Sequence, residues 1–186
     1  LRISVANLPQ HEIPLIRLLS ISELEQKINR YQRELKSRRR TPSGAPKRVF
    51  YSYSQEDEPL RGRLEQHLRQ FCRNGLIQPW TDREIRAGGE RQREIEMHMD
   101  QADLILLLLS PSFLASDYCY EHEAQRALQL HRQGRARVVP IILRPVLWEE
   151  SPLGGLQPLP TGGKPVVRWP DEDEAWVDVA KGIRAL

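Results

Sequence analysis

The sequence predicts an α/β fold, a flavodoxin-like five-stranded parallel sheet in the order 2-1-3-4-5 with helices on both faces. From residue 47 onward, short β-rich runs alternate with longer amphipathic segments, which is the pattern of strands joined by helical crossovers. The run ADLILLLL at 102–109 ends in six consecutive apolar residues. A strand that is apolar on both sides is typical of the centre of a parallel sheet covered on both faces.

Each expected element is supported by local signals. The strands are expected at 48–54, 76–81, 102–109, 137–143 and 165–169. The helices are expected at 59–74, 90–101, 117–132 and 171–186. Gly75 supplies a stop for the first of these helices, and Asp171 is a good N-cap for the last. Pro79 weakens the second strand because proline cannot donate a hydrogen bond to its neighbour.

Residues 1–46 are expected to form an N-terminal arm, separate from a domain at 47–186. Ser20 and Glu23 have the spacing of a capping box, so an amphipathic helix is expected at about 20–40, followed by a linker. Its apolar residues repeat at spacings of three and four, which suits either self-association or packing on the chain's own domain.

The charge of the chain is unevenly distributed. Residues 1–47 contain ten Lys and Arg and four Asp and Glu, a balance of +6, whereas the remainder contains 18 and 21, a balance of −3. A basic arm suits either a solvated helix or contact with an acidic partner or nucleic acid. The domain itself is not expected to bind nucleic acid.

Several classes of protein are excluded by the sequence. The longest apolar run, 104–109, is far too short to cross a bilayer, and two cysteines offer no disulfide framework, which fits a reducing cytoplasm. The phosphate-binding pattern GxxxxGK[ST], the dinucleotide pattern GxGxxG after the first strand, and the hydrolase pattern GxSxG are all missing. No second Cys/His pair completes a zinc site with Cys119 and His122, so no metal is expected. Because residue 1 is leucine, we expect a fragment or a renumbered chain.

An ordered set of motifs resembles the TIR (Toll/interleukin-1 receptor) domain family, in its bacterial NAD-cleaving type. The motifs are RVFYSYS with the acidic pair 56–57, the segment 80–89, the strand and helix start at 102–123, and RVVPIILRP at 137–145 with Trp148. Together they cover about 140 of 186 residues in the family's order. No one motif is specific, but the ordered set is.

The resemblance implies one of two functions. Many TIR domains cleave NAD, releasing nicotinamide and leaving linear or cyclic ADP-ribose, and in bacteria this serves anti-phage immunity after self-assembly. Other TIR domains are non-catalytic scaffolds for signalling. Either function implies homo-oligomers through TIR–TIR contacts, with a sensor domain outside this sequence. NAD is then a substrate, and no cofactor is implied. The BB loop is the implied assembly element, with Arg83, Glu84, Ile85, Gly88 and Gly89.

The family's catalytic glutamate maps to Glu123 through the pattern Glu-x-x-x-Ala-Leu, with Glu121 as the competing alignment. On an α-helix these two carboxylates lie about 160° apart, so only one can face a cleft. The nicotinamide–ribose bond breaks through an oxocarbenium-like transition state, as in glycoside hydrolysis. Nicotinamide leaves as a neutral base, so one carboxylate that faces the developing positive charge is sufficient.

Five further residues are expected to contact the substrate. In open α/β sheets ligands bind beyond the carboxyl ends of the strands, which nominates Tyr53 and Ser54 after the first strand and Ser110 after the third. Asp82 in the BB loop and Cys119, one helical turn before Glu123, complete the set. Cys119 stands where several NAD-cleaving relatives have an aromatic residue. Ser54 and Gln55 stand where one animal enzyme has arginines.

Overall fold

The computed structural model describes residues 45–80 and 90–186. The expected helix at about 20–40 and the BB-loop residues 82–89 lie outside these described ranges. Within them, no helix is both long enough and apolar enough to cross a membrane.

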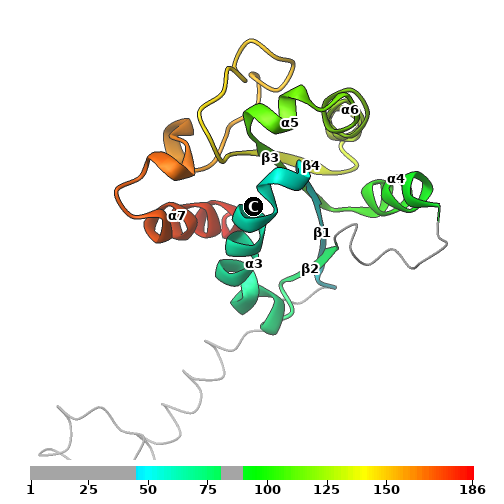
Figure 1. Cartoon of the computed structure of the whole chain (residues 1–186). Helices are drawn as coiled ribbons and strands as arrows, with labels where there is room; N and C mark the ends of the chain where they lie inside the picture. Colours follow the sequence, from blue (N-terminus) through cyan, green and yellow to red (C-terminus); the bar gives the residue numbers. More distant parts are fainter. Residues whose placement is uncertain (1–44, 81–89) are drawn as a thin grey trace, which may run out of the picture. The chain divides into compact units, whose positions relative to one another are not determined.

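The sheet is parallel and has the predicted order β2-β1-β3-β4 (Figure 1). Its strands are β1 (Lys47–Ser52), β2 (Ile77–Trp80), β3 (Leu104–Leu109) and β4 (Arg137–Ile142). All six residues of β3 are buried, which confirms that this apolar run is a central strand covered on both faces. The α/β fold class is therefore confirmed.

The fifth strand expected at 165–169 is wrong, because this stretch contains the 3-10 helix η7 (Val166–Arg168). The described part of the sheet has four strands. The amides of Arg168 and Trp169 donate within the turn, to Pro165 at 2.9 Å and Val166 at 3.1 Å, and so form no ladder. Next to β4, Ile141 forms only an isolated bridge with Leu159.

Helices cover both faces of the sheet, as predicted. On one face lie α3 (Glu58–Arg73) and α7 (Glu172–Arg184), packed against β-strand residues that alternate with those facing the other side. On the opposite face lie α4 (Arg91–Gln101), α5 (Pro111–Ala115), the π-helix η5 (Tyr118–Ala124) and α6 (Gln125–Arg132) (Figure 1). The short 3-10 helices η3 (Gln55–Asp57) and η6 (Thr161–Gly163) lie in loops. Gly75, the predicted stop of α3, has a φ of 66° that suits only glycine well.

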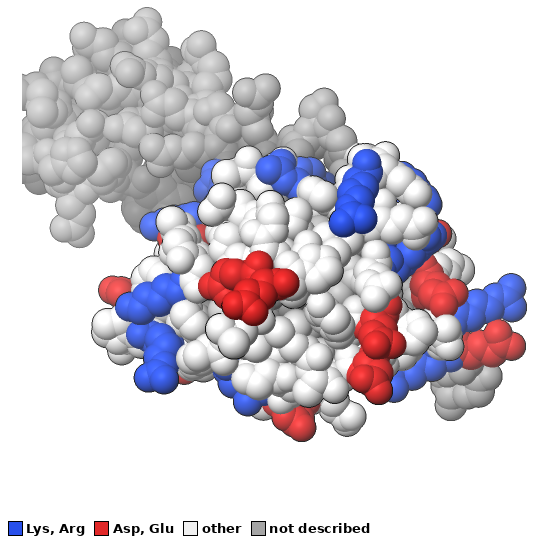
Figure 2. Space-filling view, turned by 90° about the horizontal axis from the view of Figure 1, so that it is seen from above, with Lys and Arg blue, Asp and Glu red and all other residues white. Residues whose placement is uncertain are grey.

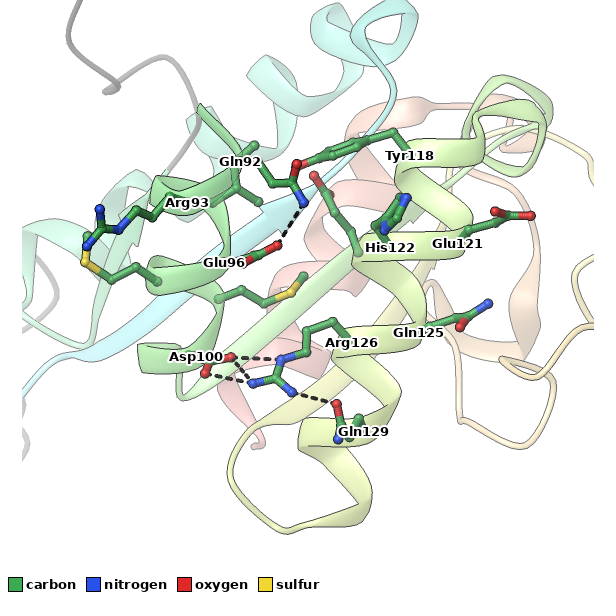
Figure 3. Close-up of a pocket in the computed structure, with 14 residues that line it drawn as sticks. Gln92, Arg93, Glu96, Asp100, Tyr118, Glu121, His122, Gln125, Arg126 and Gln129 are labelled. Atoms are coloured by element: carbon green, nitrogen blue, oxygen red, sulfur yellow. Dashed lines mark hydrogen bonds and ion pairs between the residues drawn. The ribbon is translucent and has the colours of Figure 1, made fainter. Parts of the chain in front are cut away.

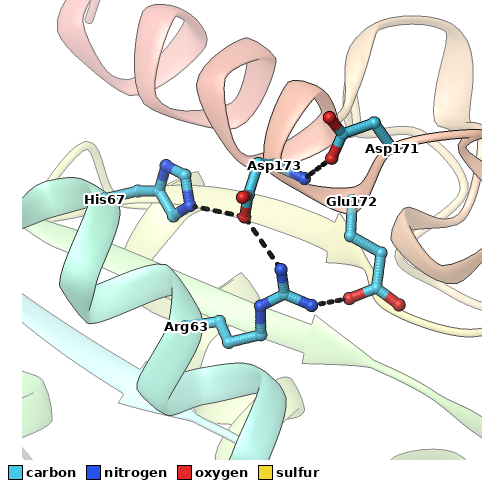
Figure 4. Close-up of polar contacts among 5 residues, drawn as sticks. All are labelled: Arg63, His67, Asp171, Glu172 and Asp173. Carbon is cyan, nitrogen blue, oxygen red and sulfur yellow. Dashed lines mark hydrogen bonds and ion pairs between the residues drawn. The ribbon is translucent and has the colours of Figure 1, made fainter.

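An ion cluster joins α3 to the first turn of α7 (Figure 4). Arg63 pairs with Glu172 and with Asp173, the latter at 2.8 Å, and His67 lies 3.3 Å from the same Asp173 carboxylate. Asp171 accepts from the Asp173 amide at 2.8 Å, which confirms it as the N-cap. Arg63, and then His67, lower the pKa of Asp173 below its usual value.

This cluster should make stability depend on pH at the acid end. Because the folded-state pKa of Asp173 is below the unfolded value of 3.8, its stabilisation is complete above that value and is lost as pH falls. Asp173→Asn should therefore lower the free energy of unfolding at pH 7, and the difference from the wild type should shrink below about pH 4. Urea denaturation at pH 7, 5 and 3 measures it.

Glu174→Gln is the matched control, because it removes an exposed carboxylate from the same helical turn. Glu174→Gln should lower the free energy of unfolding at pH 7 by less than Asp173→Asn does. Equal losses for the two variants would show that the helix terminus, not Arg63, is what Asp173 stabilises.

Candidate functional site

The glutamate singled out by sequence lies in a π-helix. The continuous α-helix expected at 117–132 is wrong in its first half, because η5 precedes α6. A π-helix closes its hydrogen bonds over five residues rather than four, and such turns are frequent at functional sites. Near the start of this turn, the Cys119 amide donates to Ser116 Oγ at 3.2 Å. The wider turn changes which residues share a face with Glu123.

The Glu123 side chain is buried against the end of β1. Its residue is 8% exposed, and Oε2 accepts a hydrogen bond from Ser52 Oγ at 2.5 Å. Ser52 is the last residue of β1 and is fully buried. Glu121 is instead exposed and points away from α4 (Figure 3). The structure thus separates the two candidate carboxylates, and the buried one lies at the carboxyl end of a strand. The catalytic role of Glu123 stays a prediction.

A cavity of about 270 Å³ lies beside this carboxylate. Its lining residues come from the end of β1, the start of α4 and η5. They are Phe50, Tyr51, Tyr53, Ser54, Gln55, Arg91, Ile95, Ser116, Tyr118, Cys119 and Glu123. The cavity brings together four residues that the sequence predicted for one site, namely Tyr53, Ser54, Cys119 and Glu123. Cys119 also contacts the residue that follows β1, with its Sγ 3.6 Å from the Tyr53 carbonyl oxygen.

A larger polar groove of about 770 Å³ runs between α4 and η5–α6 (Figure 3). It shares Ile95, Tyr118 and Glu123 with the smaller cavity. Further along the groove, Arg126 reaches across from α6 to Asp100 on α4, with a shortest separation of 2.7 Å. This pair joins the two helices. Because Tyr118 and Glu123 line both the groove and the cavity, they lie where the two adjoin.

Tyr118 is a site residue that the sequence reasoning missed. Burial, and then the negative charge of Glu123, raise the pKa of Tyr118 to about 12, so its phenol stays protonated near neutral pH. Its ring also lies against His122, with 5.7 Å between ring centroids. On an ordinary α-helix, Cys119, four residues before Glu123, would share its face. In the π-helix, Tyr118, five residues before Glu123, also lines the cavity.

Ser110 has a structural position rather than a place in the cavity lining. Its fully buried hydroxyl donates to Asp57 and accepts from the Phe113 amide at 3.0 Å, which caps α5. Asp57 is 1% exposed and also pairs with Arg144 at 3.0 Å. This group ties together the loops that follow β1, β3 and β4. The expected substrate contact by Ser110 therefore finds no support in the geometry, and Asp82 lies outside the described residues.

The charged side chains of the described residues outside this site are mixed in sign on the face that Figure 2 shows. In the described ranges, no three His, Cys, Asp or Glu residues are placed to hold a metal ion. On the face seen in Figure 2, acidic and basic side chains are both present around a largely uncharged centre. That face has no continuous basic stripe of the kind that tracks a nucleic-acid backbone.

Comparison with known families agrees with this arrangement. The model of the TIR domain family matches residues 49–178, which include β2, β3, β4, most of β1 and the helix with Glu123. The chain belongs to the TIR domain family. The TIR domain is 50% identical over 136 residues to the uncharacterized protein y4lF of Sinorhizobium fredii. This match covers 73% of the chain and 42% of y4lF, so the chain spans less than half of that relative's length.

A solved structure is also similar to this TIR domain. It is the crystal structure of the TIR domain of the Toll-related receptor TRR-2 from Hydra magnipapillata, at 20% sequence identity and a TM-score of 0.47. The match covers 73% of this chain and 97% of the receptor domain.

The ion pair between the buried Asp57 and the half-buried Arg144 should stabilise the TIR domain measurably. Arg144→Met keeps most of the side-chain volume but leaves the buried Asp57 carboxylate with one partner fewer, so we expect a loss of about 2 kcal/mol in unfolding free energy. Urea denaturation followed by circular dichroism measures it. Arg135→Met is the control, because Arg135 pairs with Asp100 in an exposed position at 3.6 Å and should cost less than about 1 kcal/mol. Equal losses of unfolding free energy in Arg144→Met and Arg135→Met would contradict a special stabilising role for the pair of Asp57 and Arg144.

Proposed function

We propose that this TIR domain cleaves the nicotinamide–ribose bond of NAD, with Glu123 as the catalytic carboxylate. The observation that carries the proposal is the burial of Glu123 beside a cavity at the carboxyl end of β1, held by Ser52. Burying a carboxylate costs free energy even where it accepts hydrogen bonds, and buried ionisable groups that line a cavity are frequent at functional sites.

The reaction needs little more than this carboxylate and a nucleophile. The C–N bond breaks with its electron pair passing to nicotinamide, which leaves as a neutral base, and positive charge develops on the ribose. Glu123 stabilises that charge, and the low-dielectric surroundings strengthen the interaction. Water then attacks the anomeric carbon and loses a proton, giving linear ADP-ribose. Attack by a nucleophile of the same molecule gives a cyclic product instead.

Ser52 supports this chemistry by donating to the carboxylate. A hydroxyl that donates to a carboxylate favours the ionised form, which is the form that faces a cation. Tyr53, Ser54 and Cys119 line the same cavity and are proposed to contact the ribose side of the substrate. Tyr118 offers its ring and phenol to the same space. Asp82 remains a proposed contact from the BB loop.

The biological setting is also proposed. The bacterial relative y4lF, at 50% identity, supports a bacterial origin, and its greater length supports a larger protein with a sensor region. The TIR domain would then act in the cytoplasm as an effector of anti-phage immunity. Self-assembly through TIR–TIR contacts would activate it, with the BB loop at 82–89 as the proposed contact.

Glu123→Gln should reduce nicotinamide release at least about a hundredfold, since it removes the charge that stabilises the transition state while keeping the side chain's size. The assay incubates concentrated protein with NAD and resolves nicotinamide and linear or cyclic ADP-ribose by chromatography. Glu121→Gln is the matched control, because the exposed Glu121 lies two residues away on the same helix and should keep most of the activity. Full activity in Glu123→Gln would reject the site, and an inactive wild type would favour a non-catalytic scaffold.

Ser52→Ala should lower kcat about tenfold or more, because a hydrogen bond to a charged group contributes about 1.5–3 kcal/mol. The acid limb of its pH–rate profile should also move to higher pH, since the lost donor favoured the ionised carboxylate. Thermal unfolding checks that the variant folds. A uniform loss at every pH would indicate a packing defect rather than a role for Ser52 in holding Glu123.

A further inference from the structure

The cavity beside Glu123 contains two opposite charges among its described lining residues. Glu123 is the carboxylate, and Arg91 is the one cationic side chain, the other nine lining residues being uncharged side chains. NAD itself has one cationic end, the nicotinamide riboside, and one anionic segment, the diphosphate. The polarity of the cavity therefore matches the polarity of the proposed substrate.

Arg91 lies at the edge of this cavity. It is the first residue of α4 and is exposed, so it lines the cavity from the rim rather than from the interior. A volume of about 270 Å³ is smaller than typical sites for drug-sized ligands, which span about 300–1,000 Å³, so it can enclose only part of a dinucleotide. With the riboside enclosed beside Glu123, the diphosphate must lie toward the rim.

Tyr118 lines the cavity together with Glu123 and Arg91. Burial is the largest cause that raises the pKa of Tyr118; the charge of Glu123 raises it further, and the charge of Arg91 lowers it. Arg91 also begins an 11-residue helix, whose first amides carry a partial positive charge. An arginine offers two parallel N–H donors that suit phosphate oxygens.

We propose that Arg91 binds the diphosphate of the substrate while Glu123 faces its nicotinamide riboside. This inference rests on the proposed function and deepens it, because it makes dinucleotides and other phosphorylated nicotinamide nucleosides the preferred substrate class. It also fixes the direction in which the substrate lies, from η5 at the riboside end to the start of α4 at the phosphate end.

A series of three substrates tests the proposal: NAD, nicotinamide mononucleotide and nicotinamide riboside, which contain two, one and no phosphate groups. Arg91→Ala should raise KM for NAD by about tenfold or more, with kcat changed much less, because the charge-assisted hydrogen bonds from the guanidinium to the diphosphate are lost. The loss in kcat/KM should be smaller for the mononucleotide and smallest for the riboside. An equal loss in kcat/KM on all three substrates would overturn the proposal, because a structural defect would lower kcat/KM whatever the number of phosphate groups in the substrate.

Arg93→Ala is the matched control. Arg93 is two residues further along α4, is strongly exposed, does not line the cavity, and lies 3.8 Å from Glu90. Its removal changes the net charge by the same amount, so the variant separates a local contact from a general loss of positive potential. A rise in KM equal to that of Arg91→Ala would overturn the proposal.

A binding measurement keeps this test separate from the proposed function. ADP-ribose contains the diphosphate but no nicotinamide, and its affinity is measured by calorimetry without turnover. Arg91→Ala should weaken this binding about tenfold or more, and Arg93→Ala should not. Binding that depends on Arg91 in a protein that does not cleave NAD would sustain this inference and reject the NAD-cleaving function. If cleavage depends on Glu123 but Arg91→Ala changes neither KM nor the affinity for ADP-ribose, the NAD-cleaving function stands and the role of Arg91 is rejected. A wild type that neither cleaves NAD nor binds ADP-ribose would overturn the proposed function and the role of Arg91 together.

Discussion

The hydrogen bond from the Ser52 hydroxyl to the Glu123 carboxylate joins the end of β1 to a helix 71 residues further along the chain. A carboxylate can be buried at this position because it receives a strong donor there. Ser52 in turn is fixed by the sheet, since it lies opposite Leu107 in the parallel register of β1 and β3. The position of the residue that holds the Glu123 carboxylate is therefore set by strand pairing.

A second buried polar group divides the carboxyl edge of the sheet into two parts. Asp57 receives the Ser110 hydroxyl and pairs with Arg144, which ties the ends of β1, β3 and β4 together. Asp57, Ser110 and Arg144 connect the loops that follow these strands, whereas Tyr53 and Glu123 line a cavity. Of the strand-end residues nominated by the rule that ligands bind at this edge, Tyr53 and Ser54 line the cavity, whereas Ser110 makes its hydrogen bonds within the protein and does not line it.

The sequence predicted what depends on apolar patterning and failed where local backbone geometry decides. The central strand at 104–109 follows from its apolar run and is confirmed. The order of the first four strands, predicted from the fold class, is also confirmed. The run at 165–169 has the apolar residues of a strand, but Pro165 begins a turn there, in which the amides of Arg168 and Trp169 donate to Pro165 and Val166. Neither the π-turn nor the place of Arg91 at the cavity rim has a signature in residue type, because both result from how the helices meet the sheet.

The π-turn shows why spacing along a sequence is an unreliable measure of which residues act together. Counting as on an α-helix pairs Glu123 with Cys119, four residues earlier, and makes the lack of an aromatic side chain there look like a defect. The wider turn adds Tyr118 to the same cavity while Cys119 packs beside the Tyr53 carbonyl. An aromatic ring thus lies beside the buried carboxylate although the position expected from α-helical spacing holds a cysteine. A substitution that restored an ordinary α-helix here would move either Tyr118 or Glu123 off the cavity, so the irregular turn is part of the site.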